Sequence, residues 1–137
     1  RSGSLGTLAC LNLVEAGFGQ STVLGLGGDP ILGTTTIEAV QALEQDPGTD
    51  AVVLLGEIGG TAEEDAAEYI ATMEKPVVAF IAGSSSPSGR KMGHAGAIVM
   101  GNKGTYISKR RALERAGATV LDMPSQLGSV MNKIMAT

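Results

Sequence analysis

The chain has 137 residues, of which 43% are hydrophobic, 18% are charged and only 3% are aromatic, and its formal net charge is −4. This length suits one domain with a single sizeable core, and the composition excludes a disordered chain. The negative charge argues against a nucleic-acid or anionic-membrane partner, and no apolar run is long enough to cross a bilayer. The lone cysteine, Cys10, cannot form an internal disulfide, is compatible with a reducing compartment, and is expected to pack as a small hydrophobic residue.

The first half of the chain is predicted to contain two helices and two strands. Residues 5–14 have apolar side chains at spacings typical of a helix that is buried on more than one side, and a preceding serine is its expected cap. Residues 21–27 are predicted to form a buried strand, and residues 34–44 an amphipathic helix. The continuous apolar run Ala-Val-Val-Leu-Leu at 51–55 is typical of a central strand in a parallel sheet.

The second half of the chain continues this alternation. Thr61 is predicted to begin a helix, with Glu64 completing a capping box. The predicted bounds are 61–73, 106–116 and 124–135 for helices, 76–82 and 118–121 for strands, and 83–104 for a long loop. Alternating strands and helices predict an α/β fold with a parallel sheet and helices on both faces. Active-site loops in such a fold lie beyond the carboxyl ends of the strands.

The long loop contains the only histidine of the chain, His94, with Gly93 and Gly96 beside it and Arg90 shortly before it. Glycine lets a backbone turn sharply and approach a partner, and a neutral imidazole is a good nucleophile near neutral pH. These neighbours favour a carrier of a transferred group, with Arg90 and the glycines supporting the loop. The alternative is that His94 is an ordinary surface residue. A metal site is not expected, because there is no second histidine and Cys10 is distant in sequence.

A carboxylate, Glu57, follows the predicted strand at 51–55 and is flanked by glycines in the motif Gly-Glu-Ile-Gly-Gly. A carboxylate at this position can accept the N–H of an imidazole, select one tautomer and stabilise the imidazolium that forms when the ring accepts a phosphoryl group. The alternative is a solvated loop glutamate. The motif alone does not decide between the two.

Several motifs occur in order along the chain and together resemble one enzyme family. They are Arg-Ser-Gly at 1–3, Gly-Gly-Asp-Pro at 27–30, Gly-Glu-Ile-Gly-Gly at 56–60, Lys-Pro-Val-Val at 75–78 and Met-Gly-His-Ala-Gly-Ala at 92–97. In this combination the chain resembles the C-terminal ligase domain of succinyl-CoA synthetase alpha subunits. These belong to the superfamily of acyl-CoA ligases that form a nucleoside diphosphate, as do ATP-citrate lyase and citryl-CoA synthetase. The resemblance covers essentially the whole chain.

This resemblance implies a flavodoxin-like, three-layer fold and roles for residues in three of these motifs. It implies that His94 is phosphorylated on a ring nitrogen and that Glu57 orients it. Ser2 and Gly3 match the start of a helix that binds the phosphate at its N-terminus. Arg1, Arg90 and Lys91 are expected to add positive charge near the phosphate, with at least one of them merely solvated.

The resemblance also implies parts beyond this chain. It predicts that a first strand and an N-terminal CoA-binding domain precede Arg1, so that residues 1–137 are a fragment, inactive alone. A beta subunit with an ATP-grasp domain would bind ATP or GTP with Mg²⁺. The whole enzyme, a carbon–sulfur ligase of the EC 6.2.1 type in the tricarboxylic acid cycle, would use CoA as a substrate in the cytoplasm or the mitochondrial matrix.

Some positions depart from the family pattern and leave the acid substrate open. They are Leu-Gly-Thr-Leu at 5–8, Ser-Ser-Pro at 85–87 and Gly-Asn-Lys-Gly at 101–104. Citrate-specific relatives usually have arginine at the position of Pro30, so this proline favours succinate. The alternatives are a citrate-specific relative and a non-catalytic flavodoxin-like docking module that keeps the motif without turnover.

Overall fold

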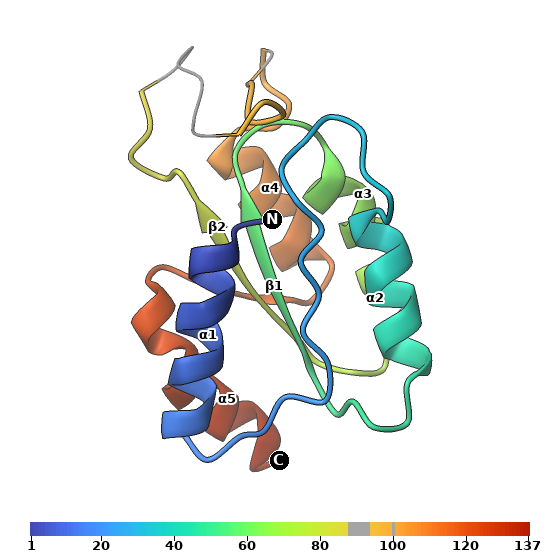
Figure 1. Ribbon diagram of the computed structural model, residues 1–137, viewed down its shortest axis with the longest axis vertical. Coiled ribbons are helices and arrows are strands. Elements are labelled where there is room, and N and C mark those ends of the chain that lie inside the picture. The colour runs from blue at the N-terminus through green and yellow to red at the C-terminus, as the bar shows by residue number, and fades with distance from the viewer. Residues whose placement is uncertain (88–93, 100) are drawn as a thin grey trace.

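The computed structural model describes residues 1–87, 94–99 and 101–137, and it has the α/β architecture that the sequence predicts (Figure 1). Its sheet consists of three parallel strands in the order β1-β2-β3. The strands are β1 Val52–Glu57, β2 Val77–Ala82 and β3 Thr119–Leu121. Three predicted strands are thus confirmed to within two residues at each end.

Helices cover both faces of the sheet, so the molecule has three layers (Figure 1). The two sides of each strand bury alternate residues: Val52 and Leu54 of β1 face the cluster with α2, α3 and α4, whereas Val53 and Leu55 face α1 and α5. The helices are α1 Gly3–Glu15, α2 Thr36–Gln45, α3 Ala62–Ile70, α4 Tyr106–Arg115 and α5 Leu127–Met135, and a short 3₁₀ helix, η1, spans Pro124–Gln126. Both core clusters therefore form on one continuous sheet.

The central strand is β2, and the prediction that residues 51–55 form a central strand is wrong for the described residues. Val78 and Ala79 in β2 are fully buried, because a strand lies on each side and helices cover both faces. In β1, Val53 and Leu55 keep partial exposure, since the strand lies at an edge of the sheet. The apolar run indicated the strand correctly but not its place in the sheet.

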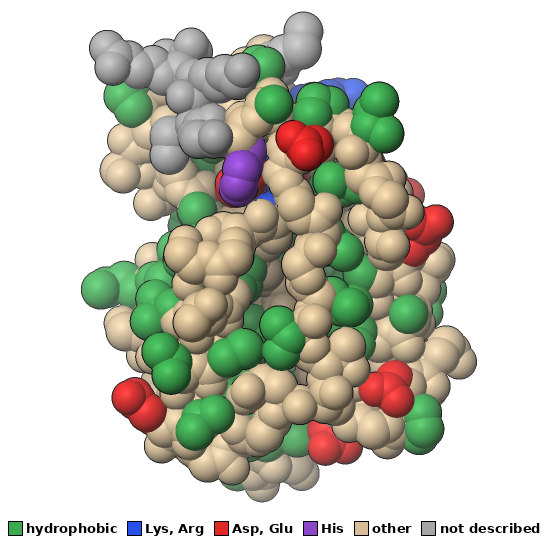
Figure 2. Space-filling view, in the orientation of Figure 1, with side chains coloured by type: hydrophobic (Ala, Val, Ile, Leu, Met, Phe, Trp, Pro, Cys, Tyr) green, Lys and Arg blue, Asp and Glu red, His purple; other side chains and the backbone are tan. Residues whose placement is uncertain are grey.

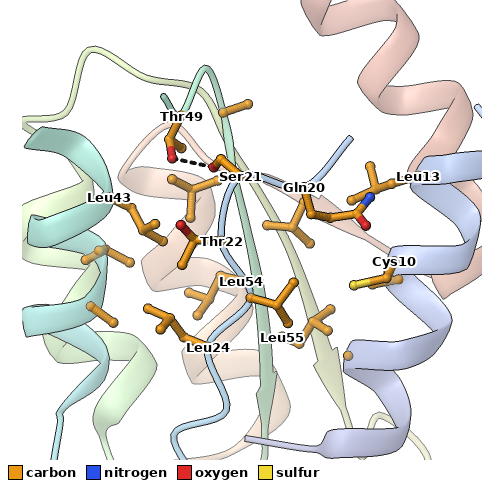
Figure 3. Close-up of a pocket in the computed structure, with 18 of the residues that line it drawn as sticks. Cys10, Leu13, Gln20, Ser21, Thr22, Leu24, Leu43, Thr49, Leu54 and Leu55 are labelled. Atoms are coloured by element: carbon orange, nitrogen blue, oxygen red, sulfur yellow. Dashed lines mark hydrogen bonds between the residues drawn. The ribbon is translucent and has the colours of Figure 1, made fainter. Parts of the chain in front are cut away.

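The predicted strand at residues 21–27 is not formed. This segment is extended and passes beside β1, but it makes no sheet pairing, and Val23 and Leu24 are 63% and 51% exposed. Between it and β1 lies an apolar groove with a cavity volume of about 260 Å³, into which Leu24, Leu54 and Leu55 project (Figure 3). A strand needs a hydrogen-bonded neighbour, and this groove separates the segment from the nearest one.

The first helix is confirmed, but its predicted burial on several sides is not. Ser2 caps α1 by accepting the N–H of Leu5 at 3.3 Å. Ala9 and Leu13 are buried against α5, whereas Leu11 is 57% exposed. One face of a helix is enough to pack on the sheet, so the remaining apolar residues stay at the surface. Cys10 is partly buried and lies on the wall of the groove (Figure 3).

The predicted capping box at Thr61 is also wrong. Thr61 precedes α3, but its side chain makes no capping bond and its hydroxyl instead donates to the carboxylate of Asp65 at 3.0 Å. Glu64 accepts the N–H of Gly104 at 3.1 Å. A complete capping box is present at α2, where Thr35 and Glu38 satisfy each other's backbone N–H groups.

Among the described residues no helix has the length and apolar character needed to span a membrane.

Candidate functional site

Glu57 and His94 meet at the carboxyl end of β1. The imidazole Nδ1 of His94 lies 2.7 Å and 2.8 Å from the two carboxylate oxygens of Glu57. A carboxylate only accepts hydrogen bonds, so Nδ1 carries the proton and the lone pair is on Nε2. The side chain of His94 is 39% exposed and that of Glu57 is 12% exposed. The histidine side chain is visible at the surface in Figure 2, so part of it is open to solvent.

Two glycines allow the close approach of the His94 loop to the loop after residue 27. A Cβ on Gly28 would lie 2.2 Å from Cγ of His94, a separation that no side chain can occupy. Gly96 donates its N–H to the carbonyl of Gly28 at 3.0 Å, and a Cβ on Gly96 would lie 2.8 Å from that oxygen. The loop after residue 27 and the His94 loop are therefore in direct contact. The sequence predicted no role for Gly28, and the glycine pair in Gly-Gly-Asp-Pro at 27–30 was the only signal for one.

The guanidinium of Arg1 contacts the carboxylate of Glu57 and supplies positive charge to the site. Its Nη2 is 3.3 Å from Oε1 of Glu57, and its Nη1 donates to the carbonyl of Gly59 at 3.1 Å. Its side chain is only 7% exposed. Arg1 and His94 therefore share the Glu57 carboxylate, which fixes that carboxylate from two sides.

The start of α1 is close to this cluster in sequence and in space. Ser2 and Gly3 directly follow Arg1, so α1 begins at the end of the sheet where Glu57 and His94 lie. A Cβ on Gly3 would meet no atom within 4 Å, which leaves open space at the first turn. Binding of phosphate there stays a prediction. Gly93 and Arg90, the other predicted loop-support residues, lie outside the described residues, as does Lys91.

Ion pairs connect Glu57 to other charged side chains. Arg1 contacts Glu57 and Glu63, and Lys109 contacts Glu63 and Glu64, so three carboxylates are linked to two cationic side chains. The described residues contain no cluster of three His, Cys, Asp or Glu side chains able to hold a metal ion.

Sequence comparison identifies relatives with known names. Residues 1–119 match the sequence model of the CoA-ligase family. The succinate–CoA ligase [ADP-forming] subunit alpha of Methanothermobacter thermautotrophicus is 58% identical over 127 residues, covering 93% of this chain and 43% of its own length. The corresponding subunit of Aquifex aeolicus is 50% identical over 136 residues, covering 98% of this chain and 45% of its own length. The chain therefore spans less than half the length of these relatives.

Two solved structures are similar to this chain at lower sequence identity. ATP citrate lyase from Methanosaeta concilii, in complex with (3S)-citryl-CoA, superposes with a TM-score of 0.74 and 29% identity, covering 80% of this chain and 19% of that one. ATP citrate lyase from Methanothrix soehngenii, in complex with citrate and coenzyme A, gives the same values. Both solved structures support the α/β fold of this chain.

Proposed function

Because the chain belongs to the CoA-ligase family, we propose that it is the phosphohistidine-carrying domain of a nucleoside-diphosphate-forming acyl-CoA ligase. The observation that supports this most directly is the bidentate contact of Glu57 with Nδ1 of His94. It leaves Nε2 as the nucleophile and places a negative charge where the imidazolium develops.

In the proposed reaction, His94 carries the phosphoryl group between two partners. Nε2 attacks the terminal phosphorus of a nucleoside triphosphate, the bond to the leaving diphosphate breaks, and N-phosphohistidine forms. The acid's carboxylate then takes the phosphoryl group to give an acyl phosphate and restores neutral His94. The CoA thiol finally displaces inorganic phosphate, and the products are acyl-CoA, nucleoside diphosphate and phosphate. A covalent intermediate divides one difficult step into easier ones.

Ser2 and Gly3 are proposed to hold the phosphoryl group at the N-terminus of α1. The first N–H groups of a helix have no intrahelical partner and are the positive end of its dipole. The open space at Gly3 and the neighbouring Arg1 guanidinium fit an anion at this position. The loop residues Gly93, Gly96 and Arg90 are proposed to support His94 when it is phosphorylated.

Succinate is the acid we propose, because the succinate–CoA ligase subunits above are at least 50% identical to this chain, whereas the citrate lyases are 29% identical. The rest of the enzyme would consist of a CoA-binding domain and a beta subunit with an ATP-grasp domain that binds ATP or GTP with Mg²⁺. The proposed location is the cytoplasm or the mitochondrial matrix; a relative from Trichomonas vaginalis is named mitochondrial.

Labelling of the complete enzyme tests this function. Incubation with a nucleoside triphosphate labelled in its terminal phosphate should place acid-labile, base-stable label on this chain. The His94→Asn variant should lose both the label and overall turnover, while its urea unfolding curve stays close to that of the wild type. Turnover near the wild-type rate in that variant would remove His94 from the mechanism, and an unlabelled wild-type chain would favour a docking module.

We also propose that the apolar groove beside β1 holds a strand that precedes Arg1 in the longer protein. One edge of β1 has no partner strand among the described residues and faces the groove, where a further strand could pair with it. The segment at 21–27 would then gain a neighbour and join the sheet. A chain extended by the residues that precede Arg1 should show slowed amide exchange at 21–27; unchanged exchange there would refute the strand.

A further inference from the structure

The most deeply buried ion pair among the described residues lies behind Glu57. Glu63, in the first turn of α3, and Lys109, in the first turn of α4, are 1% and 0% exposed and contact each other through Oε2 and Nζ. Removing two charges from water is costly, and well-packed apolar residues would often join two helices equally well or better. Joining α3 to α4 therefore does not by itself explain these charges.

The two oxygens of Glu63 contact different groups. Oε2 accepts from Lys109, while Oε1 accepts the main-chain N–H of Glu57 at 3.1 Å and lies 3.4 Å from Nη1 of Arg1. Glu63 is thus linked to the backbone of Glu57 and to the guanidinium that contacts the Glu57 side chain. Only a group with acceptors at both ends can make these contacts together, and an ionised carboxylate is such a group.

Lys109 holds Glu63 in this orientation. Its three donors are all used, since it also contacts Oε2 of Glu64 at 2.9 Å and donates to the carbonyl of Gly60 at 3.2 Å. The ammonium requires an oxygen at one end of Glu63, which leaves the other oxygen for Glu57. Through Gly60, the Lys109 ammonium also contacts the loop that follows Glu57.

The glycine that precedes Glu57 makes space for this arrangement. A Cβ on Gly56 would lie 2.7 Å from both Cγ and Oε1 of Glu63, and 2.8 Å from Cδ1 of Ile81. The Glu63 side chain therefore passes directly against the backbone of β1 at residue 56. This contact gives the first glycine of the Gly-Glu-Ile-Gly-Gly motif a physical reason that is separate from chain flexibility.

We propose that Glu63 is a positioning residue for His94. Through its contacts with the main-chain N–H of Glu57 and with Arg1, Glu63 directs the Glu57 carboxylate toward Nδ1 of His94. Lys109 keeps the Glu63 side chain in the orientation that this requires. This inference rests on the proposed function for its importance to phosphorylation. Its geometric part, the selection of one His94 tautomer, does not depend on any reaction.

The test compares Glu63→Gln with a matched control, Glu64→Gln. Both residues lie in the first turn of α3 and both contact Lys109, but only Glu63 contacts Glu57. An amide has one acceptor end, so Glu63→Gln cannot satisfy Lys109 and the Glu57 N–H together. Because His94 is the only histidine in residues 1–137, its ring ¹⁵N signals in this chain are unambiguous.

We expect the wild type and Glu64→Gln to show one tautomer, with the proton on Nδ1, and Glu63→Gln to show a mixture. In the complete enzyme, Glu63→Gln should slow phosphohistidine formation by about 10–100-fold, the scale seen when an outer partner of a functional histidine is removed. Urea unfolding of each variant separates this effect from lost stability. Should Glu63→Gln not fold, Glu63→Asp keeps the charge beside Lys109 but is too short to reach the Glu57 N–H as well, with Glu64→Asp as its control.

Identical His94 spectra in the Glu63 variant and its Glu64 control would overturn the proposal and leave the pair a link between α3 and α4. A wild-type enzyme that forms no phosphohistidine would instead overturn the proposed function. The tautomer measurement would still decide whether Glu63 positions the ring, so the two failures are distinguishable.

Discussion

The close contact between Gly28 and His94 predicts that the Gly28→Ala substitution displaces the imidazole and slows phosphohistidine formation. Gly28 does not have a positive φ, so alanine meets no left-handed backbone strain there, and the three atoms nearest to the added Cβ all belong to His94. The added Cβ would lie 2.2 Å from Cγ and 2.4 Å from Nδ1 of His94. Carbon atoms in contact prefer about 3.5–4.0 Å, so the ring must move by roughly 1.3 Å or more.

This displacement is enough to break the contact with Glu57. The two Nδ1–oxygen distances are 2.7 Å and 2.8 Å, and Arg1 holds the carboxylate so that it does not follow the ring freely. A hydrogen bond to a charged group contributes about 1.5–3 kcal/mol. Losing that stabilisation in the transition state corresponds to a rate reduction of about 10–150-fold, at roughly 1.4 kcal/mol for each factor of ten.

The assay is the rate of phosphohistidine formation in the complete enzyme, measured by rapid quench with labelled nucleoside triphosphate. Gly33→Ala is the matched control, because it lies in the same loop, has no positive φ and would meet no atom within 4 Å. It should react at the wild-type rate. A Gly28→Ala enzyme that reacts equally fast would refute the reasoning, since His94 would then not occupy this position when it is phosphorylated.

Three further predictions concern single side chains. Glu57→Gln keeps the shape of the side chain but loses its charge, so phosphohistidine formation should slow by about 10²–10⁴-fold in the same assay, and an unchanged rate would contradict its role. Thr35→Ala should lower the free energy of unfolding in urea by about 1 kcal/mol, whereas Thr61→Ala, which removes no capping bond, should cost less than half as much; equal losses would contradict this assignment. Leu113→Ala should cost about 2–5 kcal/mol because its side chain is fully buried, while Ile107→Ala on the exposed side of α4 should change stability by less than about 0.5 kcal/mol, and similar values for both would contradict the burial.

The sequence was most informative where a local pattern has one physical meaning. Alternating strands and helices predicted the α/β layers, and the apolar run at 51–55 predicted β1 because a buried strand must be apolar on both faces. The carboxyl-end rule then brought Glu57 and the His94 loop to the same end of the sheet, where the structure places them in contact. Their catalytic roles remain proposals.

Two predictions, the capping box at Thr61 and the strand at 21–27, were wrong because they depend on hydrogen-bond partners elsewhere in the chain. Glu64 has the spacing of a capping residue, but Gly104 and Lys109 offer it hydrogen bonds from elsewhere in the chain. Residues 21–27 have the composition of a strand, yet a strand exists only when another strand pairs with it. A local sequence pattern shows neither the alternative partners of Glu64 nor the lack of a pairing strand for residues 21–27.

The sequence by itself therefore determined the layers, the order of the elements and the two residues at the centre of the site, because periodicity and motif spacing act locally along the chain. Only the tertiary structure decided that Gly28 makes room for the imidazole, that Arg1 shares the Glu57 carboxylate, and that Glu63 and Lys109 lie buried behind it. These contacts join residues that are far apart in the chain: 66 positions for Gly28 and His94, 56 for Arg1 and Glu57, and 46 for Glu63 and Lys109. Their existence depends on how the helices pack across the sheet, and that packing is a property of the whole chain.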